Sequence, residues 1–188
     1  MTFTRAFGVL VLLGLLSVPA VADDITEAMD QARKAYQSGD LTNAKKSLDL
    51  ASQLIGQKNA ESFAALLPNP LPGWKADKAQ TTAVGAVAFG ASVATRSYTN
   101  AKGDHVDVQI TGDSAMVMQF ASLLSNPQFA GAMGKLIRVG SQRAIQTPDG
   151  DVNMVIANKF LITVQGSADA AAKLAYAQAV DVAKLSKI

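Results

Sequence analysis

The chain has 188 residues, with 17 Lys and Arg against 15 Asp and Glu, one His, no Cys and 49% hydrophobic residues. This composition is typical of one or two small globular domains, and it excludes disordered, collagenous and disulfide-stapled chains. The formal net charge of +2 argues against a nucleic-acid binder, which gathers many Lys and Arg on one face. Without Cys the chain has no thiolate zinc site, iron–sulfur cluster or cysteine nucleophile.

Residues 1–22 have the pattern of a secretory signal peptide. Arg5 is their only charge, an apolar run follows over 6–18, and an A-x-A cleavage site ends at Ala22. A membrane span needs about 20 apolar residues, and this run is shorter and is followed by Pro19. The sequence therefore predicts export, cleavage after Ala22, and a periplasmic mature protein without a transmembrane span.

Residues 23–67 have the composition and spacing of a helical hairpin. Strong helix formers dominate this segment and no Pro interrupts it. Apolar residues recur every three or four positions on both sides of Gly39-Asp40, as on one buried face of each helix. The first set is Ile25, Met29, Ala32 and Tyr36, and the second is Leu41, Ala44, Leu48, Ala51 and Ile55. We expect two antiparallel helices with their corner at Gly39, the second running toward Leu67, with a break near Gly56 left open.

Around this corner the chain resembles the middle of a tetratricopeptide repeat. The residues that carry the resemblance are Ala32, Tyr36, Gly39-Asp40, Ala44, Leu48 and Ala51. They cover one unit, whereas a repeat array needs about three units to bury a continuous core, so the resemblance implies a lone hairpin. Two interpretations stay open. Either the hairpin packs against the rest of the chain, or Tyr36 and Leu48 belong to a docking surface for a partner helix.

A proline-rich linker over 68–73 separates the hairpin from the rest of the chain. It holds three Pro in five positions, and a helix cannot continue through them because each Pro lacks an N–H and restricts the residue before it. We interpret it as a semi-rigid spacer, with a ligand for an aromatic groove as the alternative. Trp74 follows directly and is expected to bury its ring at the start of the next domain; it is also a candidate for partner binding.

Residues 74–188 change from helical to alternating periodicity. The expected strands are 92–99, 105–111, 135–147, 152–157 and 159–165, and the expected helices are 115–125 and 168–187. In the second strand Val106, Val108 and Ile110 point one way and polar residues the other, so one face is core and the other faces solvent or ligand. The order of elements predicts an α+β fold, with an N-terminal helical hairpin followed by an antiparallel sheet packed with two helices.

In element order this sheet domain resembles the sandwiches of the Mog1/PsbP-like group. The resemblance rests on the Gly73-Trp74 entry, the helix in the middle and the closing helix after a strand hairpin. The whole chain also resembles uncharacterised exported proteins of proteobacteria, through Leu67-Pro68, Pro72-Gly73-Trp74, Val180, Asp181 and Leu185. Neither resemblance implies an activity.

His105 is the only histidine, so a Ser–His–Asp site would have to use it, with Asp104 or Asp107 as its neighbour. The chain has no G-x-S-x-G elbow and no P-loop pattern, so an ordinary exposed hairpin histidine is favoured over a catalytic one. Asp149-Gly150-Asp151 lacks the spacing of an EF-hand loop. We therefore expect no metal site and no cofactor.

Four polar residues are candidates for ligand binding, and one apolar segment stands out. The candidates are Lys135, Arg138, Arg143 and His105, because guanidinium and ammonium groups receive anions; a solvated strand face is the alternative. Residues 83–91 are small, apolar and almost without charge. They form either a buried strand pair, in which glycine permits close approach, or an exposed patch for a partner or a membrane.

These patterns favour a soluble periplasmic protein that acts as a non-catalytic binding or interaction module. Its partner, a protein or a small molecule, is unknown, and nucleic acid is not expected. Two alternatives remain, namely a hydrolase-type enzyme with an unrecognised site and an envelope-surface-associated protein.

Overall fold

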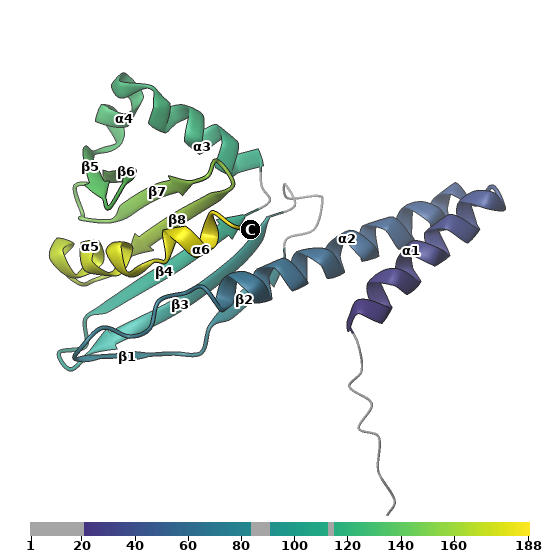
Figure 1. The fold of residues 1–188 in the computed structure, drawn as a ribbon, viewed down its shortest axis with the longest axis horizontal. Helices are drawn as coiled ribbons and strands as arrows, with labels where there is room; N and C mark the ends of the chain where they lie inside the picture. Colours follow the sequence, from purple (N-terminus) through teal and green to yellow (C-terminus); the bar gives the residue numbers. More distant parts are fainter. Residues whose placement is uncertain (1–20, 84–90, 113–114) are drawn as a thin grey trace, which may run out of the picture.

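The computed structural model describes residues 21–83, 91–112 and 115–188. It confirms the α+β fold class, because an N-terminal pair of helices is followed by an antiparallel sheet and further helices (Figure 1). Residues 1–20 of the predicted signal peptide and 84–90 of the apolar segment lie outside the described residues.

Helices α1 (Val21–Gln37) and α2 (Leu41–Ala64) form an antiparallel hairpin that projects from the sheet domain (Figure 1). The predicted corner is confirmed, since Gly39 has a φ of +80° and the Asp40 carboxylate caps α2 by accepting the Asn43 N–H at 3.0 Å. Helix α2 runs through Gly56 without a break. A Cβ at Gly56 would lie 3.2 Å from Cβ of Ala83, so glycine serves there to let the sheet approach the helix.

The sheet has eight strands among the described residues, in the order β1-β3-β4-β8-β7-β6-β5, with β2 also paired to β3. All pairings are antiparallel. The strands are β1 (Trp74–Ala76), β2 (Gln80–Ala83), β3 (Ser92–Asn100), β4 (His105–Gly112), β5 (Lys135–Val139), β6 (Gln142–Gln146), β7 (Val152–Ile156) and β8 (Phe160–Gln165). The single strand expected over 135–147 was wrong, because Gly140 takes a φ of +57° and turns the chain into the β5–β6 hairpin.

The remaining helices are α3 (Ala115–Ser125), α4 (Pro127–Met133), α5 (Ala170–Ala179) and α6 (Val182–Leu185). The sequence did not predict α4, which Asn126 caps by accepting the Gln128 N–H at 3.1 Å. The single closing helix expected over 168–187 was also wrong. Val180 has an extended backbone with ψ 126°, and Asp181 then caps a second helix through the Lys184 N–H at 3.0 Å.

The main core lies between one face of the sheet and helices α2, α5 and α6. The sheet contributes Ala94, Tyr98, Val106, Val108, Ile110, Met154, Ile156, Phe160, Ile162 and Val164, and the helices contribute Phe63, Tyr176, Ala177 and Leu185. Val106, Val108 and Ile110 are therefore core residues, as the alternation predicts. On the other face α3 packs against β6, β7 and β8, where Val117, Ile145 and Leu161 are buried outside this core.

The proline-rich linker is docked on the sheet domain by two buried tyrosines. The Tyr98 hydroxyl donates to the Pro68 carbonyl at 2.6 Å, and the Leu71 N–H donates to the Tyr176 hydroxyl at 3.2 Å. The Tyr176 ring contacts Trp74 edge-on at a centroid distance of 5.4 Å and Tyr98 at 4.4 Å. These contacts fix where the hairpin enters the sheet domain, and they give Trp74 the packing role that its position after the linker predicts.

The buried tyrosines make stability fall at high pH. Burial raises the pKa of Tyr98 to about 12 and also raises the pKa of Tyr176. Because an unfolded tyrosine loses its proton near pH 10, this stabilisation is complete below about pH 10 and is lost as the pH rises toward 12. We expect the free energy of unfolding to fall in that range by up to about 1.4 kcal/mol per pH unit for one tyrosine. Urea unfolding of the parent and of Tyr98→Phe at several pH values between about 10 and 12 checks this. The unfolding free energy of the variant is expected to fall less steeply with pH, and an equally steep fall would contradict the prediction.

Candidate functional site

The hairpin buries its small residues and exposes its large apolar ones. Ala28, Ala32, Ala44 and Ala51 form the seam between the two helices, each at most 6% exposed. Six large side chains are between 44% and 70% exposed, namely Met29, Tyr36, Leu41, Leu48, Leu50 and Ile55. The hairpin therefore keeps its largest apolar side chains in solvent, and burying one such side chain is worth about 1.5–3 kcal/mol.

Five of these side chains share one side of the hairpin, which we name the outer face: Met29, Tyr36, Leu41, Leu48 and Ile55. On α2, Leu41, Leu48 and Ile55 follow one another at seven-residue spacing, and on α1 the same spacing joins Met29 and Tyr36. Seven residues make about two helical turns, so each set forms one stripe. The two stripes meet across a groove of about 270 Å³, lined by Met29, Ala32, Arg33, Tyr36, Ala44 and Leu48.

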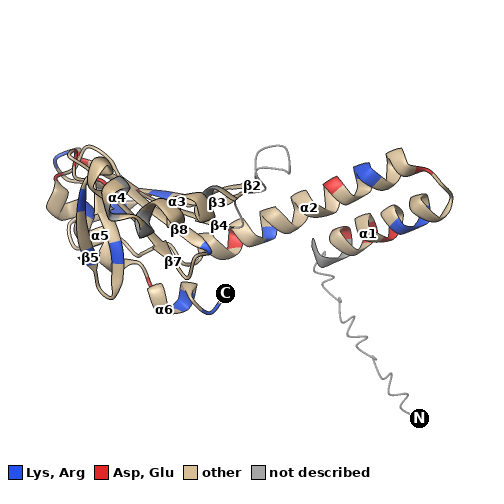
Figure 2. Ribbon diagram, turned by 90° about the horizontal axis from the view of Figure 1, so that it is seen from above, with Lys and Arg blue, Asp and Glu red and all other residues tan. Residues whose placement is uncertain are grey.

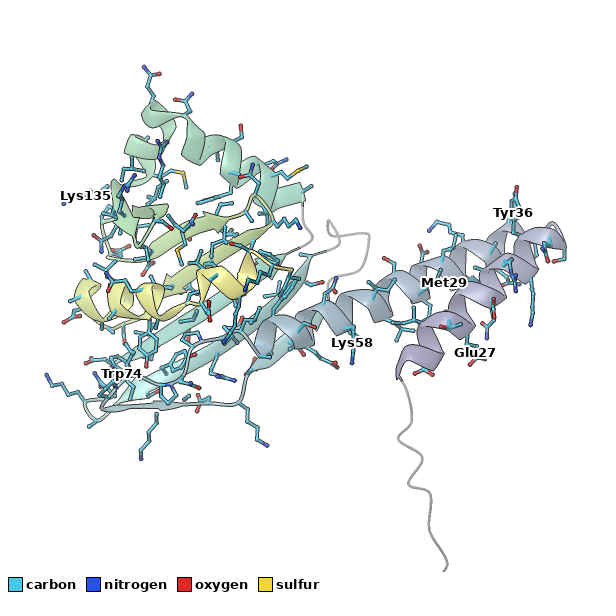
Figure 3. The ribbon with its side chains drawn as sticks, viewed as in Figure 1. Glu27, Met29, Tyr36, Lys58, Trp74 and Lys135 are labelled. Carbon is cyan, nitrogen blue, oxygen red and sulfur yellow. The ribbon has the colours of Figure 1, made fainter. Side chains whose placement is uncertain are left out.

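The expectation that Met29, Tyr36, Leu41, Leu48 and Ile55 belong to buried helical faces was wrong. The seam of a two-helix hairpin is narrow, and here the alanines fill it. The larger apolar residues beside the seam remain outside it, and Tyr36 points outward near the tip (Figure 3). Sequence reasoning identified Tyr36 and Leu48 as docking candidates but missed Met29, Leu41 and Ile55 in this role. Their seven-residue spacing was the signal that would have found them.

Two ion pairs border the outer face, one on each helix. Arg33 contacts Asp30 at 3.0 Å, and Lys45 contacts Asp49 at 2.7 Å. In both pairs the basic residue is the one nearer the tip (Figure 2). All four side chains are more than half exposed, so each pair adds little to the stability of the monomer and remains available to a partner.

The opposite side of the hairpin has a second, more polar hollow of about 310 Å³. It is lined by Asp24, Glu27, Ala28, Gln31, Leu50 and Leu54. Its rim on α1 carries two carboxylates, whereas the groove of the outer face is almost entirely apolar. The outer face is thus the better candidate for hydrophobic docking.

The four candidates for ligand binding do not form one site. Arg138 and Arg143 are cross-strand partners on β5 and β6, and both are exposed. Lys135 lies three positions before Arg138 on the same strand, so its side chain is on the opposite face of the sheet. Strands β6, β7 and β8 separate β5 from His105 on β4. Trp74 and Lys135 lie on strands at opposite edges of the sheet (Figure 3).

His105 contacts a serine, but the contact ties two chain segments together. Its Nδ1 lies 2.8 Å from the Ser167 Oγ, and the same oxygen accepts the His105 N–H at 3.0 Å. The two acids considered as its neighbours are engaged elsewhere, because Asp104 accepts a bond from the Asn100 side chain and Asp107 accepts one from Ser97. Within the described part of the chain, no carboxylate bonds to the imidazole. The pair thus lacks the orienting acid of a Ser–His–Asp site.

The Asp149-Gly150-Asp151 turn binds a side-chain ammonium of the same chain, that of Lys173. The Lys173 ammonium, with its side chain 3% exposed, donates to the Asp149 carbonyl at 2.8 Å and contacts the Asp151 carboxylate at 2.7 Å. Sequence reasoning missed Lys173, since a lysine on an apolar helix gives no signal of its burial. Among residues 21–83, 91–112 and 115–188, no group of three or more potential His, Cys, Asp or Glu metal ligands occurs.

None of the helices that the structure describes is long and apolar enough to cross a membrane. Comparisons with protein-family models, curated proteins and solved structures found no match to the chain. The outer face of the hairpin is therefore the feature on which a functional assignment rests.

Proposed function

We propose that the chain is exported to the periplasm and acts there as a non-catalytic binding protein that docks a helical partner on the outer face of its hairpin. The observation that carries this proposal is the inverted distribution of side chains, with alanines inside the hairpin and large apolar residues outside. A hairpin that only braced the sheet would gain nothing from exposed leucines. A hairpin that binds apolar helices needs them.

The energetics of the outer face suit reversible binding. Five large apolar side chains, each worth about 1.5–3 kcal/mol on full burial, offset the cost of association, which is on the order of 4–15 kcal/mol. Their two stripes and the apolar groove between them match the ridges of an amphipathic helix or helix pair. The face thus supplies enough apolar area for recognition without any catalytic group.

The hairpin presents this face from a fixed position. The buried Phe63 ring near the end of α2 meets Phe160 of β8 edge-on at a centroid distance of 5.3 Å. The docked linker then holds the chain that leaves α2. A pre-organised surface loses less conformational entropy on binding than a mobile one, which favours recognition by this element. Export itself is proposed from the signal-peptide pattern of residues 1–22.

Photo-crosslinking in the producing cells tests the proposal. A photoreactive benzoylphenylalanine at position 48 is expected to form an adduct of higher mass, recovered in the periplasmic fraction. The matched control carries the same amino acid at position 99, because Thr99 is exposed on β3 of the sheet. Adduct from position 48 alone supports docking on the hairpin. Equal adduct from both positions, or none from position 48, contradicts it.

A further inference from the structure

The end of the sheet that lies away from the hairpin carries basic residues and no acidic ones. It consists of α3, α4, β5 and β6, which we name the edge lobe because β5 is an edge strand of the sheet (Figure 1). From residue 114 to residue 148 the sequence has three basic residues, Lys135, Arg138 and Arg143, and no Asp or Glu. The whole chain is nearly balanced, with 17 basic and 15 acidic residues, so the positive charge of this lobe is a local feature.

The edge lobe also exposes large apolar side chains. Residues 114–134, which include α3 and α4, have no charged side chain. Met118, Leu123, Met133 and Leu136 are between 37% and 67% exposed. Apolar side chains that gather in one exposed region mark a surface that meets another molecule or a membrane.

Leu136 and the two arginines point to the same face of the sheet that α3 covers. Paired residues on neighbouring antiparallel strands share a face, and Leu136 pairs with Ile145 while Arg138 pairs with Arg143. Ile145 is fully buried outside the main core, on the side of α3. Residues two apart on a strand also share a face, so Arg138 and Arg143 lie beside Leu136 on that side.

The two arginines lack an anion. They are cross-strand partners and both are exposed, and like charges opposite each other are unfavourable. None of the ion pairs among the described residues includes Arg138 or Arg143. On the hairpin, by contrast, Arg33 and Lys45 each pair with an aspartate. The edge lobe is therefore able to accept anions from another molecule without breaking an ion pair of its own.

We propose that the edge lobe binds the surface of a membrane that contains anionic lipids. Such a surface presents phosphate groups directly above an apolar layer, and proteins that lie in it combine apolar side chains with Lys or Arg. The edge lobe has both, side by side on one face. A protein surface mixes charges of both signs, whereas an anionic bilayer presents one sign. Three basic residues without an acidic one match the bilayer.

This attachment leaves the hairpin free. Helix α2 packs against β2 and β3, whereas β5 is at the opposite edge of the sheet. The hairpin projects away from the edge lobe (Figure 1). A chain bound to a membrane through the edge lobe therefore still presents the outer face of its hairpin. The inference uses residues separate from the outer face, and it does not depend on the docking function.

Co-sedimentation with vesicles tests the charge requirement. The purified protein is expected to bind vesicles made of equal parts of phosphatidylethanolamine and phosphatidylglycerol, with a partition constant on the order of 10⁴ M⁻¹, as for a single acyl chain. It is not expected to bind phosphatidylcholine vesicles. Because one basic residue near an anionic surface contributes about a fivefold factor, Arg138→Gln with Arg143→Gln is expected to weaken binding by about twentyfold or more.

The matched control for that variant is Arg33→Gln with Lys45→Gln, which loses the same charge on the hairpin. We expect it to weaken binding by less than about twofold, because screening limits the reach of an exposed charge to about 10 Å. Circular dichroism checks that both variants stay folded. Equal loss in the two variants, equal binding to both kinds of vesicle, or no binding at all would overturn the proposal. Displacement by inorganic phosphate at constant ionic strength would also overturn it, since it would show a site for one small anion.

A fluorescent label tests which apolar side chains enter the membrane. Because the chain has no Cys, Leu136→Cys and Leu48→Cys each take one nitrobenzoxadiazole label, and the two parent leucines are similarly exposed, at 50% and 57%. With anionic vesicles the emission at position 136 is expected to shift to the blue and gain intensity, while the emission at position 48 stays unchanged. A shift at position 48 alone, or at neither position, contradicts the proposal.

An acidic protein is the other class of partner that this test separates. A photoreactive residue at position 136 that captures an acidic protein in cells, together with a purified chain that ignores anionic vesicles, would show that the edge lobe docks a protein. The membrane proposal would then be wrong. Photo-crosslinking at position 48 is read independently of this result, so the failure of one proposal is distinguishable from the failure of the other.

Discussion

Phe63→Ala is expected to lower the free energy of unfolding by about 3–4 kcal/mol, whereas Leu48→Ala lowers it by less than about 0.5 kcal/mol. Both residues are large apolar side chains on the same helix, but Phe63 is 2% exposed and Leu48 is 57% exposed. The Phe63 ring fills the space over Gly112, where a Cβ would lie 2.7 Å from two ring atoms. Its truncation leaves a cavity at the junction of hairpin and sheet.

Urea unfolding of the purified chain, in the absence of any partner, measures this difference. Under those conditions Leu48 has no partner to lose, so its truncation reports only on the monomer. A loss for Leu48→Ala comparable with that for Phe63→Ala would mean that the outer face is part of the fold, and it would count against docking. The expected pair of results assigns the end of α2 to stability and its free part to recognition.

Most of the fold was predictable because local patterns specify it. The corner at Gly39 needs a left-handed backbone, which glycine supplies, and the alternation of Val106, Val108 and Ile110 identifies the core face of β4. Strands β1 and β2 were not predicted. They are short, largely exposed and partly polar, and they become strands because β3 offers them an edge. Pairing of that kind depends on tertiary contacts that a local pattern does not carry.

The candidate site was predictable only in part, for a related reason. A spacing of three and four residues shows that a helix has an apolar side, and it identified Tyr36 and Leu48 as candidates for docking. How much of that side a neighbour covers depends on the width of the seam, and alanines make the seam of this hairpin narrow. Arg138 and Arg143 came together because the turn at Gly140 pairs their strands. Lys135 does not join them because it lies three positions before Arg138 and so points to the opposite face of the sheet. His105 does not join them because strands β6, β7 and β8 lie between β5 and its own strand β4.

Lys173→Ala is expected to lower the free energy of unfolding by about 2–3 kcal/mol. Removing one partner of a buried ion pair costs about 3–5 kcal/mol, and the expected value is lower because the Asp151 side chain is 28% exposed, so water replaces part of the lost contact. The ammonium joins α5 to the turn between β6 and β7 through Asp149 and Asp151. Losing it loosens that turn from the helix.

A double variant separates the ion pair from the packing of the lysine stem. Lys173→Met keeps most of the buried stem but leaves the Asp151 carboxylate without its cation, so we expect a clear loss of stability. Adding Asp151→Ala removes that unpaired charge, and the two changes together are expected to cost at least about 1 kcal/mol less than their sum. Urea unfolding of the parent, both single variants and the double variant measures the coupling. Strict additivity would show that Lys173 acts through its aliphatic stem alone, and that the turn is held to α5 by packing such as that of Gly150 on Ala170.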